Sequence, residues 1–450
     1  MKPPKIFRDP LYNYISIDRE NDQWLLDLLD TPEVQRLRRI HQLGVSFFTY
    51  TGADHSRLSH SLGVLHLMQQ AVEHLKGDSK AHIGAARHAL LASALLHDVG
   101  HAPFSHLFEG PLGLKHEQWS CQAVLSPDTE VNAILKGIDA DLPKQVAELI
   151  KKDNFNRPLW QKNLLSSQLD VDRLDYLRRD SLFTGSGYGH FDWYRIVHTF
   201  ELYGNPNLNS ITVWPDKTKY SIEEYIFARF YMYENVYMHK TTRGYEKLLH
   251  AMWKIARQMF DNGDSKSIVK PIKEFWKAKD PSFRQFEVLE ESVVLYQIQE
   301  WQSHKNKALA DLAHRFLNRK GFGSVPAPLG TNPLDDLSEW KVALHKLVKK
   351  YGYSPPESYV LTDEYEIEIY APYRPEKSDE QTPSNAIRIV NEKDGPQEIT
   401  MLLPRLKAVI DKPKRTVLYY LPKEPKELIE EAKKLKADFD KPAVKRPRRT

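Results

Sequence analysis

Three histidines and one aspartate lie in twelve residues, "LLHDVGHAPFSH" (95–106), at the end of an apolar stretch. The apolar residues before His97 recur at helical spacing, and Gly100 is placed as a helix stop. We therefore expect His97 and Asp98 at a helix end, where both side chains can point at one ion. Mixed imidazole and carboxylate ligands with open positions suit a divalent metal that assists phosphate hydrolysis.

Two ligands are too few, so others must come from distant segments. Candidates are His60 in "RLSHSLG" and Asp172 in "QLDVDRLDYLRRD". Asp172, Asp175, Tyr176 and Arg179 share one helical face. This face could be a solvated stripe with internal ion pairs, which is what composition alone favours. It could instead bring a ligand, a phenol and cations to an anionic substrate.

Most of the chain that must position these residues reads as helix. We predict a helical body over 1–320, with helices at 142–152, 166–181, 221–261, 284–301 and 305–319 among others. Pro-rich breakers follow, and then alternating segments at 358–370, 385–390, 398–403 and 416–421 predict short strands, with a helix at 425–439. The predicted fold class is mainly α: a helical body (1–320), a small α+β region (330–435) and a basic tail (436–450).

Composition narrows the environment. With 41% hydrophobic and 28% charged residues, the chain is typical of a globular protein. It shows no signal-peptide core and no apolar stretch long enough to span a bilayer, and its one cysteine cannot form an internal disulfide. We therefore expect a cytoplasmic protein without a membrane partner. The net charge of +4 comes from the last ten residues, which could contact nucleic acid or be a solvated terminus.

The ordered blocks "RLSHSLG", "LLHDVGHAPFSH", "KHEQWS" and "LDVDRLDY" resemble the HD superfamily of metal-dependent phosphohydrolases. More narrowly, they are similar to the dNTP triphosphohydrolases of bacteria and animals. The similarity runs from "KIFRDPLYNYI" to "YENVYMHKTTRGYE" and continues more weakly to about residue 320. It implies an HD-domain helical bundle that releases inorganic triphosphate from a deoxynucleoside triphosphate.

The resemblance also implies residues for the metal and for catalysis. The metal ligands would be His60, His97, Asp98 and Asp172, holding Mn, Fe, Mg or Zn. The catalytic residues would be His101, His106, Glu109 and His116. His106 paired with Glu109 would position the attacking water, and His116 or His101 would protonate the leaving oxygen. Glu109 stands where the family usually has Asp, so its alignment of His106 is open.

Substrate residues follow from the same blocks. The phosphates would contact Arg57, Arg173, Tyr176 and Arg229, and the sugar would contact Gln42, Leu43, Asp180, Tyr233 and Tyr237. The close fit of Gln42 and Leu43 would exclude a 2′-hydroxyl. Tyr233 replaces a histidine of the animal proteins, so the base preference, dGTP or another, stays open.

An activator site is implied as well. Lys5, Asp30, Gln35 and Arg38 match the pattern by which the animal enzymes bind GTP or dGTP between subunits, which implies a homodimer or homotetramer. Asp30 and the residues after it could equally be an ordinary helix start, with Gln35 and Arg38 on the helix surface.

Three interpretations follow. The first is a metal-dependent dNTP triphosphohydrolase. The second keeps the metal but acts on another nucleotide or on a nucleic-acid end, as a phosphohydrolase or phosphodiesterase. The third is a non-catalytic module that senses nucleotides or binds nucleic acid, which would have no need of four ligands around an open ion.

Overall fold

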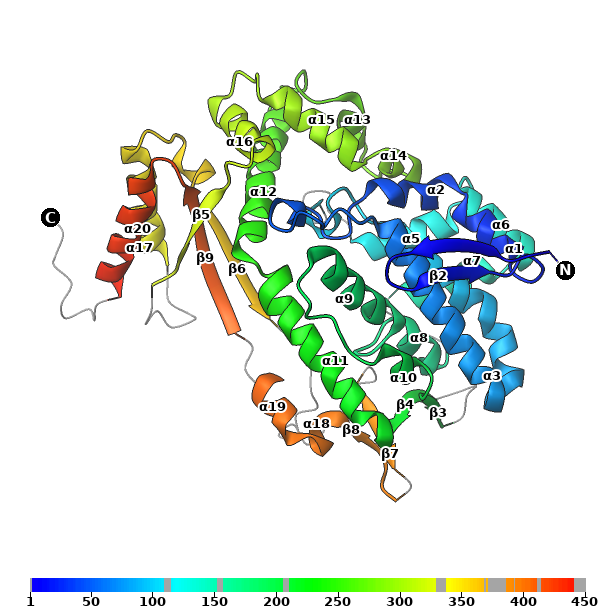
Figure 1. Cartoon of the computed structure of the whole chain (residues 1–450). Coiled ribbons are helices and arrows are strands. Elements are labelled where there is room, and N and C mark those ends of the chain that lie inside the picture. The colour runs from blue at the N-terminus through cyan, green and yellow to red at the C-terminus, as the bar shows by residue number, and fades with distance from the viewer. Residues whose placement is uncertain are drawn as a thin grey trace. The chain divides into compact units, whose positions relative to one another are not determined.

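The structure is a computed structural model of the 450-residue chain, and it describes residues 2–108, 115–151, 157–204, 210–328, 337–367, 370, 386–391, 393–410 and 414–440. Within these ranges, the side chains of 76–82, 85, 106–107, 408–409 and 414 are not described. The chain forms two compact units (Figure 1). The first comprises Met1–Val236, Asp280–Glu291 and Glu368–Lys412, and the second comprises Tyr237–Lys279, Ser292–Ile367 and Pro413–Thr450.

The first unit opens with an antiparallel hairpin of β1 (Lys5–Asp9) and β2 (Asn13–Ile17). The Oδ1 atom of Asp9 accepts the backbone N–H groups of Leu11 (2.9 Å) and Tyr12 (3.0 Å), which closes the turn. The sequence analysis missed this hairpin when it assigned 1–320 to helix, because two five-residue strands show too little alternation to stand out.

Helices make up most of the first unit. They are α1 (Gln23–Leu29), α2 (Pro32–Gln35), η1 (Arg36–Arg39), η2 (Ser46–Phe48), α3 (Arg57–Leu96), η3 (Ser105–Phe108), α5 (His116–Leu125), α6 (Glu130–Ile138), α7 (Leu142–Ile150), α8 (Leu159–Leu165), α9 (Val171–Thr184), α10 (Trp193–Val197), η4 (Asp216–Thr218), α11 (Lys219–Met232) and α14 (Phe283–Glu287). The predicted fold class, mainly α, is confirmed.

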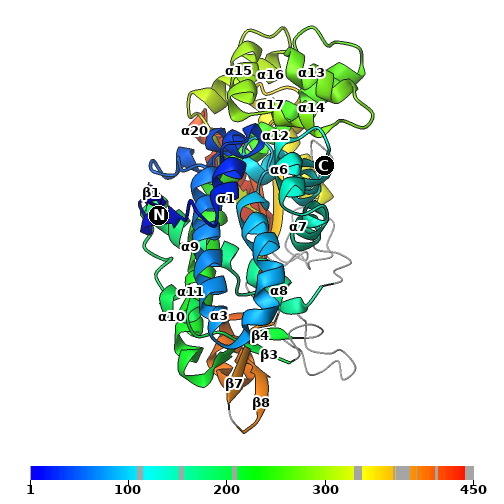
Figure 2. The same cartoon turned by 90° about the vertical axis from the view of Figure 1, so that its right-hand side faces the viewer.

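The two ends of α3 lie side by side. A straight helix would separate His60 from His97 by about 55 Å at 1.5 Å per residue. Their rings are instead 5.3 Å apart, so α3 doubles back between its ends. Figure 2 shows its two arms next to each other. The apolar side chains of both arms, Val64, Leu65, Leu90 and Leu95 among them, are buried and hold the arms together.

Late residues complete the first unit. β3 (Glu201–Tyr203), β4 (Ile211–Pro215), β7 (Arg388–Asn391) and β8 (Gly395–Glu398) form one sheet in that order, followed by α18 (Ile399–Leu402) and α19 (Pro404–Ile410). The strand predicted at 398–403 is wrong: Glu398 ends β8, and its carboxylate accepts the backbone N–H of Thr400 (3.0 Å), which begins a helix there.

The second unit packs helices on a sheet of order β5–β9–β6. Its elements are α12 (Lys240–Asp261), α13 (Lys270–Lys277), α15 (Glu291–Trp301), α16 (Lys307–Leu317), β5 (Phe322–Pro326), α17 (Ser338–Lys350), η6 (Pro356–Ser358), β6 (Leu361–Ile367), β9 (Lys414–Pro422) and α20 (Lys426–Phe439). A core that includes Val325, Trp340, Leu344, Tyr419 and Leu428 joins α17 and α20 to the sheet. The strands predicted at 358–370 and 416–421 and the helix at 425–439 are confirmed.

The predicted domain division at 320–330 does not follow these units, because helices 240–277 and 291–317 group with the C-terminal sheet. It stays a prediction, and most of the basic tail lies outside the described residues. In the part of the chain that the structure describes, no helix has the length and apolarity to cross a bilayer.

Two helices predicted as continuous are broken. The helix predicted at 221–261 is interrupted by a π-helical turn at Tyr233–Tyr237, and His239 caps the helix that follows. The helix predicted at 284–301 is interrupted after Glu287, where the carbonyls of Glu287 and Leu289 accept hydrogen bonds from Arg36.

Candidate metal and phosphate site

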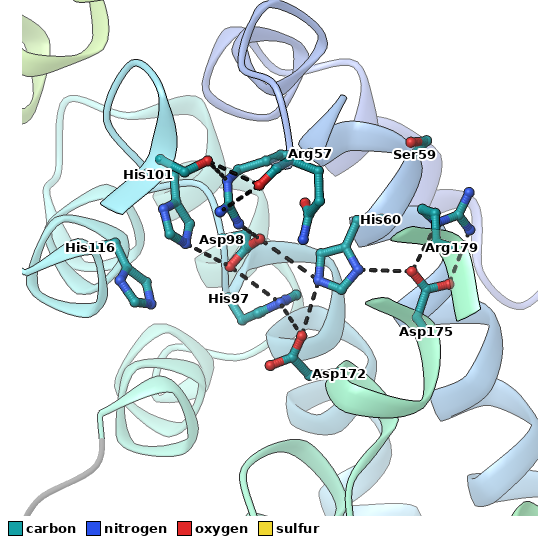
Figure 3. A network of polar contacts seen from close by, with 12 residues as sticks. Arg57, Ser59, His60, His97, Asp98, His101, His116, Asp172, Asp175 and Arg179 are labelled. Atoms are coloured by element: carbon teal, nitrogen blue, oxygen red, sulfur yellow. Dashed lines mark hydrogen bonds and ion pairs between the residues drawn. The ribbon is translucent and has the colours of Figure 1, made fainter. Parts of the chain in front are cut away.

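Four predicted metal ligands meet in one buried corner of the first unit (Figure 3). The Nε2 atom of His60 lies 3.0 Å from Asp172 Oδ1 and 3.8 Å from Asp98 Oδ2. The Nε2 atom of His97 lies 3.3 Å from Asp98 Oδ1 and 3.7 Å from Asp172 Oδ1. Donors about 2.1 Å from a metal in tetrahedral or octahedral geometry stand about 3.0–3.5 Å apart. The spacing of these atoms therefore fits one divalent ion.

The imidazole rings of His60 and His97 are also oriented for metal binding. Nδ1 of His60 lies 2.8 Å from Asp175 Oδ2, and Nδ1 of His97 lies 3.0 Å from the carbonyl of Ala94. These contacts favour a proton on each Nδ1 and turn each Nε2 toward the corner, where it can bind a metal in place of a proton. The Nε2 of His97 is buried and makes no hydrogen bond within the described residues. Such an orphaned acceptor is what a metal ligand shows when no ion is present.

Opposite charges that water does not screen determine the pKa values of the residues in this corner. Burial alone would lower the pKa of His60, but hydrogen bonds with Asp172 and Asp175 raise it to about 10. Burial alone would raise the pKa of Asp172, but the hydrogen bond with His60 and the nearby charge of His97 hold it below its usual range. The carboxylates are therefore ionised at neutral pH, and a divalent cation is the ligand that such a cluster attracts.

The chain folds locally so that His116 reaches the same corner. α3 ends at Leu96, so His97 and Asp98 follow at its C-terminal end as predicted. Gly100 is not the helix stop that we expected, since the helix has already ended. A Cβ there would lie 2.2 Å from the carbonyl of His116, so a glycine lets the N-terminus of α5 approach.

His101 and His116 form a second pair beside the ligands. Their rings stack at 4.0 Å, and Nε2 of His101 lies 3.2 Å from Asp98 Oδ1. Burial, together with the nearby cation of Arg57 and the ring of His116, holds the pKa of His101 well below its usual value. His101 is therefore neutral near pH 7. With Asp98 the two histidines form another cluster whose ligand atoms lie within 4.8 Å of one another.

The predicted phosphate residues surround this corner. Arg57 pairs with Asp98 and donates to Ser105 Oγ (2.8 Å). Arg173 pairs with Asp170 (2.5 Å), and Arg229 donates to Gln168 Oε1 (2.8 Å). The Nε atoms of Arg173 and Arg229 are buried without a hydrogen-bond partner among the described residues.

The predicted phenols belong to the same environment. The ring of Tyr176 lies 6.4 Å from that of His60, and burial and the phenol of Tyr233 raise the pKa of Tyr176 well above its usual value. The side chain of Tyr233 lies under the guanidinium of Arg229, 5.8 Å from ring centre to cation. A neutral phenol keeps its proton, so Tyr176 can donate a hydrogen bond to a phosphate oxygen.

The predicted sugar residues are also placed. Gln42 and Leu43 follow η1. The backbone N–H of Gln42 donates to the carbonyl of His55 (2.9 Å), and its carbonyl accepts from the guanidinium of Arg57 (3.5 Å). The Oε1 atom of Gln42 is a buried acceptor without a hydrogen bond in the described ranges. Asp180 is buried, and its Oδ1 lies 2.7 Å from Nε2 of His55.

Some predicted residues are not placed at the site. The backbone of His106 is part of η3, but its side chain, and all of Glu109, lie outside the described residues. Tyr237 belongs to the second unit. Of the predicted activator residues, Arg38 donates to Gln35 Oε1 (2.7 Å), Asp30 ends α1, and Lys5 is exposed at the start of β1.

The sequence analysis missed two buried residues that hold the site loops. The guanidinium of Arg36 donates to the carbonyls of His101 (2.7 Å), Glu287 (2.8 Å) and Leu289 (2.6 Å). The Oε1 atom of Glu291 accepts the N–H groups of His41 (2.8 Å) and Phe104 (3.0 Å). These partners are 65 to 253 residues apart along the chain, and no local spacing reveals them.

Comparison with known proteins agrees with this geometry. Residues 57–180 match the model of the HD domain. The chain is 34% identical over 422 residues to the Bacillus subtilis protein YwfO, which spans 93% of this chain and 92% of that protein. A crystal structure of a phosphohydrolase from Bacteroides thetaiotaomicron is 27% identical, with a TM-score of 0.74 over 93% of this chain and 99% of that chain.

The fold and the site therefore define an HD-domain phosphohydrolase, and the chain belongs to the HD superfamily of metal-dependent phosphohydrolases. It is also 28% identical over 271 residues to the deoxynucleoside triphosphate triphosphohydrolase SAMHD1 of Gallus gallus. That match spans 52% of this chain and 43% of SAMHD1, so less than half of the chicken protein is covered.

Proposed function

We propose that this HD phosphohydrolase is a dNTP triphosphohydrolase, which converts a dNTP and water into a deoxynucleoside and inorganic triphosphate. The observation that carries the proposal is that His60, His97, Asp98 and Asp172 converge at metal-ligand spacing in one corner. The partial similarity to SAMHD1 supports this substrate class.

Unsatisfied polar atoms support a nucleotide as the ligand. The buried Nε atoms of Arg173 and Arg229 are donors, as a polyphosphate requires, and the buried Oε1 of Gln42 is an acceptor, as a sugar hydroxyl requires. Gln42 and Arg57 are joined by a hydrogen bond, so the proposed sugar and phosphate contacts are adjacent. A deoxyribose next to a phosphate chain satisfies both kinds of group.

In this proposal a divalent ion held by the four ligands supplies Lewis-acid stabilisation of the α-phosphate. Water forms a bond to the α-phosphorus, the bond from phosphorus to the 5′-oxygen breaks, and that oxygen takes a proton. His101 is neutral near pH 7 and is a poor donor, so we assign the proton donation to His116, which stacks on it. Arg57, Arg173 and Arg229 offset the charge of the phosphates.

The test is a product analysis. The protein with Mn²⁺ is incubated with each dNTP and each NTP, with and without GTP, and the products are separated by chromatography. We expect deoxynucleoside and triphosphate from dNTPs. A stimulation by GTP would support an activator site at Lys5, Asp30, Gln35 and Arg38. The release of pyrophosphate or orthophosphate, or equal turnover of NTPs, would contradict the proposal.

Two variants make the test specific. His97→Ala removes a proposed ligand and is expected to abolish turnover. Gln42→Ala removes the buried acceptor and is expected to narrow the difference in kcat/KM between a dNTP and its NTP, with less effect on product identity. Asp22→Asn, which alters a buried ion pair with Arg87, serves as the control with retained activity.

A further inference from the structure

The geometry points to a buried relay of three side chains, Asp9, Arg179 and Asp175. The relay fixes the orientation of the imidazole of His60 and couples metal binding to the packing of the β1–β2 hairpin against α9. The inference rests on the proposed function only in taking His60 as a metal ligand. It concerns residues that neither touch the metal nor contact the substrate in that proposal.

The relay begins at the ligand. Asp175 Oδ2 lies 2.8 Å from Nδ1 of His60, and Asp175 is fully buried. The guanidinium of Arg179 donates to both oxygens of the same carboxylate, from Nε to Oδ2 (2.9 Å) and from Nη2 to Oδ1 (3.0 Å). A carboxylate held at both oxygens cannot rotate, so the ring of His60 that donates to it has one orientation. Figure 3 shows this run from His60 to Arg179.

The third contact of the relay joins α9 to the β1–β2 hairpin. Nη1 of Arg179 donates to Oδ2 of Asp9 (2.8 Å), at the end of β1. The other oxygen of Asp9 accepts the N–H groups of Leu11 and Tyr12 and so forms the turn. One side chain therefore both shapes the hairpin turn and binds the relay. Arg179 is fully buried and Asp9 is 8% exposed, so water does not replace these contacts.

The packing leaves space for the relay only because residue 63 is a glycine. A Cβ at Gly63 would lie 1.9 Å from Asp175 Oδ1 and 2.5 Å from Nη2 of Arg179. Gly63 is three residues after His60 on the same helix. The motif "HSLG" thus provides the ligand and the space for the groups that orient it.

The hairpin is also held by other contacts, so the relay can be interrupted by a substitution without unfolding the hairpin. The ring of Tyr12 packs on His66 (4.8 Å between ring centroids), Trp193 (5.6 Å) and the guanidinium of Arg178 (5.1 Å). Asp9→Asn keeps the Oδ1 acceptor for the turn and replaces Oδ2 by an NH₂ group, which repels Arg179. The ion pair between Asp9 and Arg179 is removed, whereas the ring of Tyr12 still lies 5.9 Å from the guanidinium of Arg179.

The experiment measures Mn²⁺ affinity by EPR of the free ion, without any substrate, so a failure of the proposed reaction does not affect it. Loss of a group that orients a ligand costs about 10–100-fold in metal affinity. We expect a loss of this size in Asp175→Asn. In Asp9→Asn and Arg179→Lys we expect a smaller loss of at least about threefold, since each leaves Asp175 in place.

The control is Asp22→Asn. Asp22 is 3% exposed and bidentate with Arg87, at 2.6 Å for each pair of atoms, and within the described residues it makes no contact with the relay. Its Mn²⁺ affinity should equal that of the wild type. Thermal unfolding with EDTA shows whether each variant is folded before titration.

Hydrogen exchange supplies the reciprocal measurement, because coupling between two sites acts in both directions. Mn²⁺ should slow amide exchange in residues 5–17 of the wild type and of Asp22→Asn, and should slow it less in Asp9→Asn, where the contact of Tyr12 with Arg179 remains. The inference is overturned if Asp9→Asn binds Mn²⁺ like the control, or if the hairpin's exchange in the wild type does not respond to the ion.

Discussion

At the scale of single residues, the site depends on close approach as much as on ligand type. Gly63 and Gly84 lie on the same helix, α3, but only Gly63 faces the buried relay. At Gly63 an added Cβ meets Asp175 and Arg179 at less than 3 Å, whereas at Gly84 no described atom outside the helix's own backbone lies within 4 Å.

We predict that Gly63→Ala destabilises the protein by about 1–3 kcal/mol, because the relay must shift to admit a methyl group. Gly84→Ala should instead be neutral or stabilise by up to about 1 kcal/mol, since alanine is the better helix former. Urea unfolding followed by tryptophan fluorescence measures both. Equal effects of the two substitutions would show that the space at Gly63 is not limiting.

A second residue-scale prediction concerns pH. The hydrogen bond of His41 with Glu291 raises the pKa of His41, against the effect of burial. Because the folded pKa is above the unfolded value near 6.5, this contribution is fully present below that value and is lost as pH rises through the folded pKa. The free energy of unfolding of the wild type should therefore exceed that of His41→Gln at pH 6, and the difference should shrink as pH rises to 9.

This difference is measured by urea unfolding in EDTA at several pH values. His190→Gln, at an exposed histidine, is the control and should change the free energy of unfolding little. A difference between wild type and His41→Gln that stays constant from pH 6 to 9 would rule out the pair with Glu291 as its source.

At the scale of elements, the loops at the site are held by a segment from far along the chain. Arg36, on η1, joins the carbonyl of His101 to the carbonyls that follow α14. Burial lowers the pKa of Arg36 to about 10, so the guanidinium still carries its charge at neutral pH. The three planar bonds are a geometry that an ammonium group cannot reproduce.

We predict that Arg36→Lys lowers the unfolding free energy by about 2–4 kcal/mol, since buried carbonyls lose their donors. Its kcat should also fall, because His101 is on the released loop. Arg39→Lys is the matched control: Arg39 pairs with Glu290 and is 51% exposed, so a change below about 1 kcal/mol is expected. If Arg36→Lys is as mild as Arg39→Lys in both measurements, η1 does not hold the loop.

At the scale of the whole molecule, the proposed metal ligands all belong to one of two compact units. We predict that calorimetry in EDTA shows more than one unfolding transition. Mn²⁺ should raise the midpoint temperature of the first unit's transition and leave the other unchanged. An ion at 100 times its Kd adds about 2.7 kcal/mol to the unit that binds it. In Asp172→Asn, Mn²⁺ should raise this midpoint temperature less than in the wild type. A single transition that moves as a whole would mean that the units unfold together.

The sequence by itself determined the chemistry of the site. The order of "RLSHSLG", "LLHDVGHAPFSH" and "LDVDRLDY" predicted which side chains form the corner, because these blocks resemble those of the HD superfamily, and helical periodicity placed His97 and Asp98 at a helix end. The same local rules predicted the mainly helical class and most of the C-terminal strands.

Only the tertiary structure decided how these elements are held together. The folding back of α3 brings His60 and His97 together although they are 37 positions apart, and the segment after α14 is held by Arg36, which lies more than 250 positions earlier. Arg36, Glu291 and the relay from Asp9 to His60 could not be predicted for the same reason. Their contacts join residues up to 253 positions apart, and a buried charge is explained only by the groups that surround it in space.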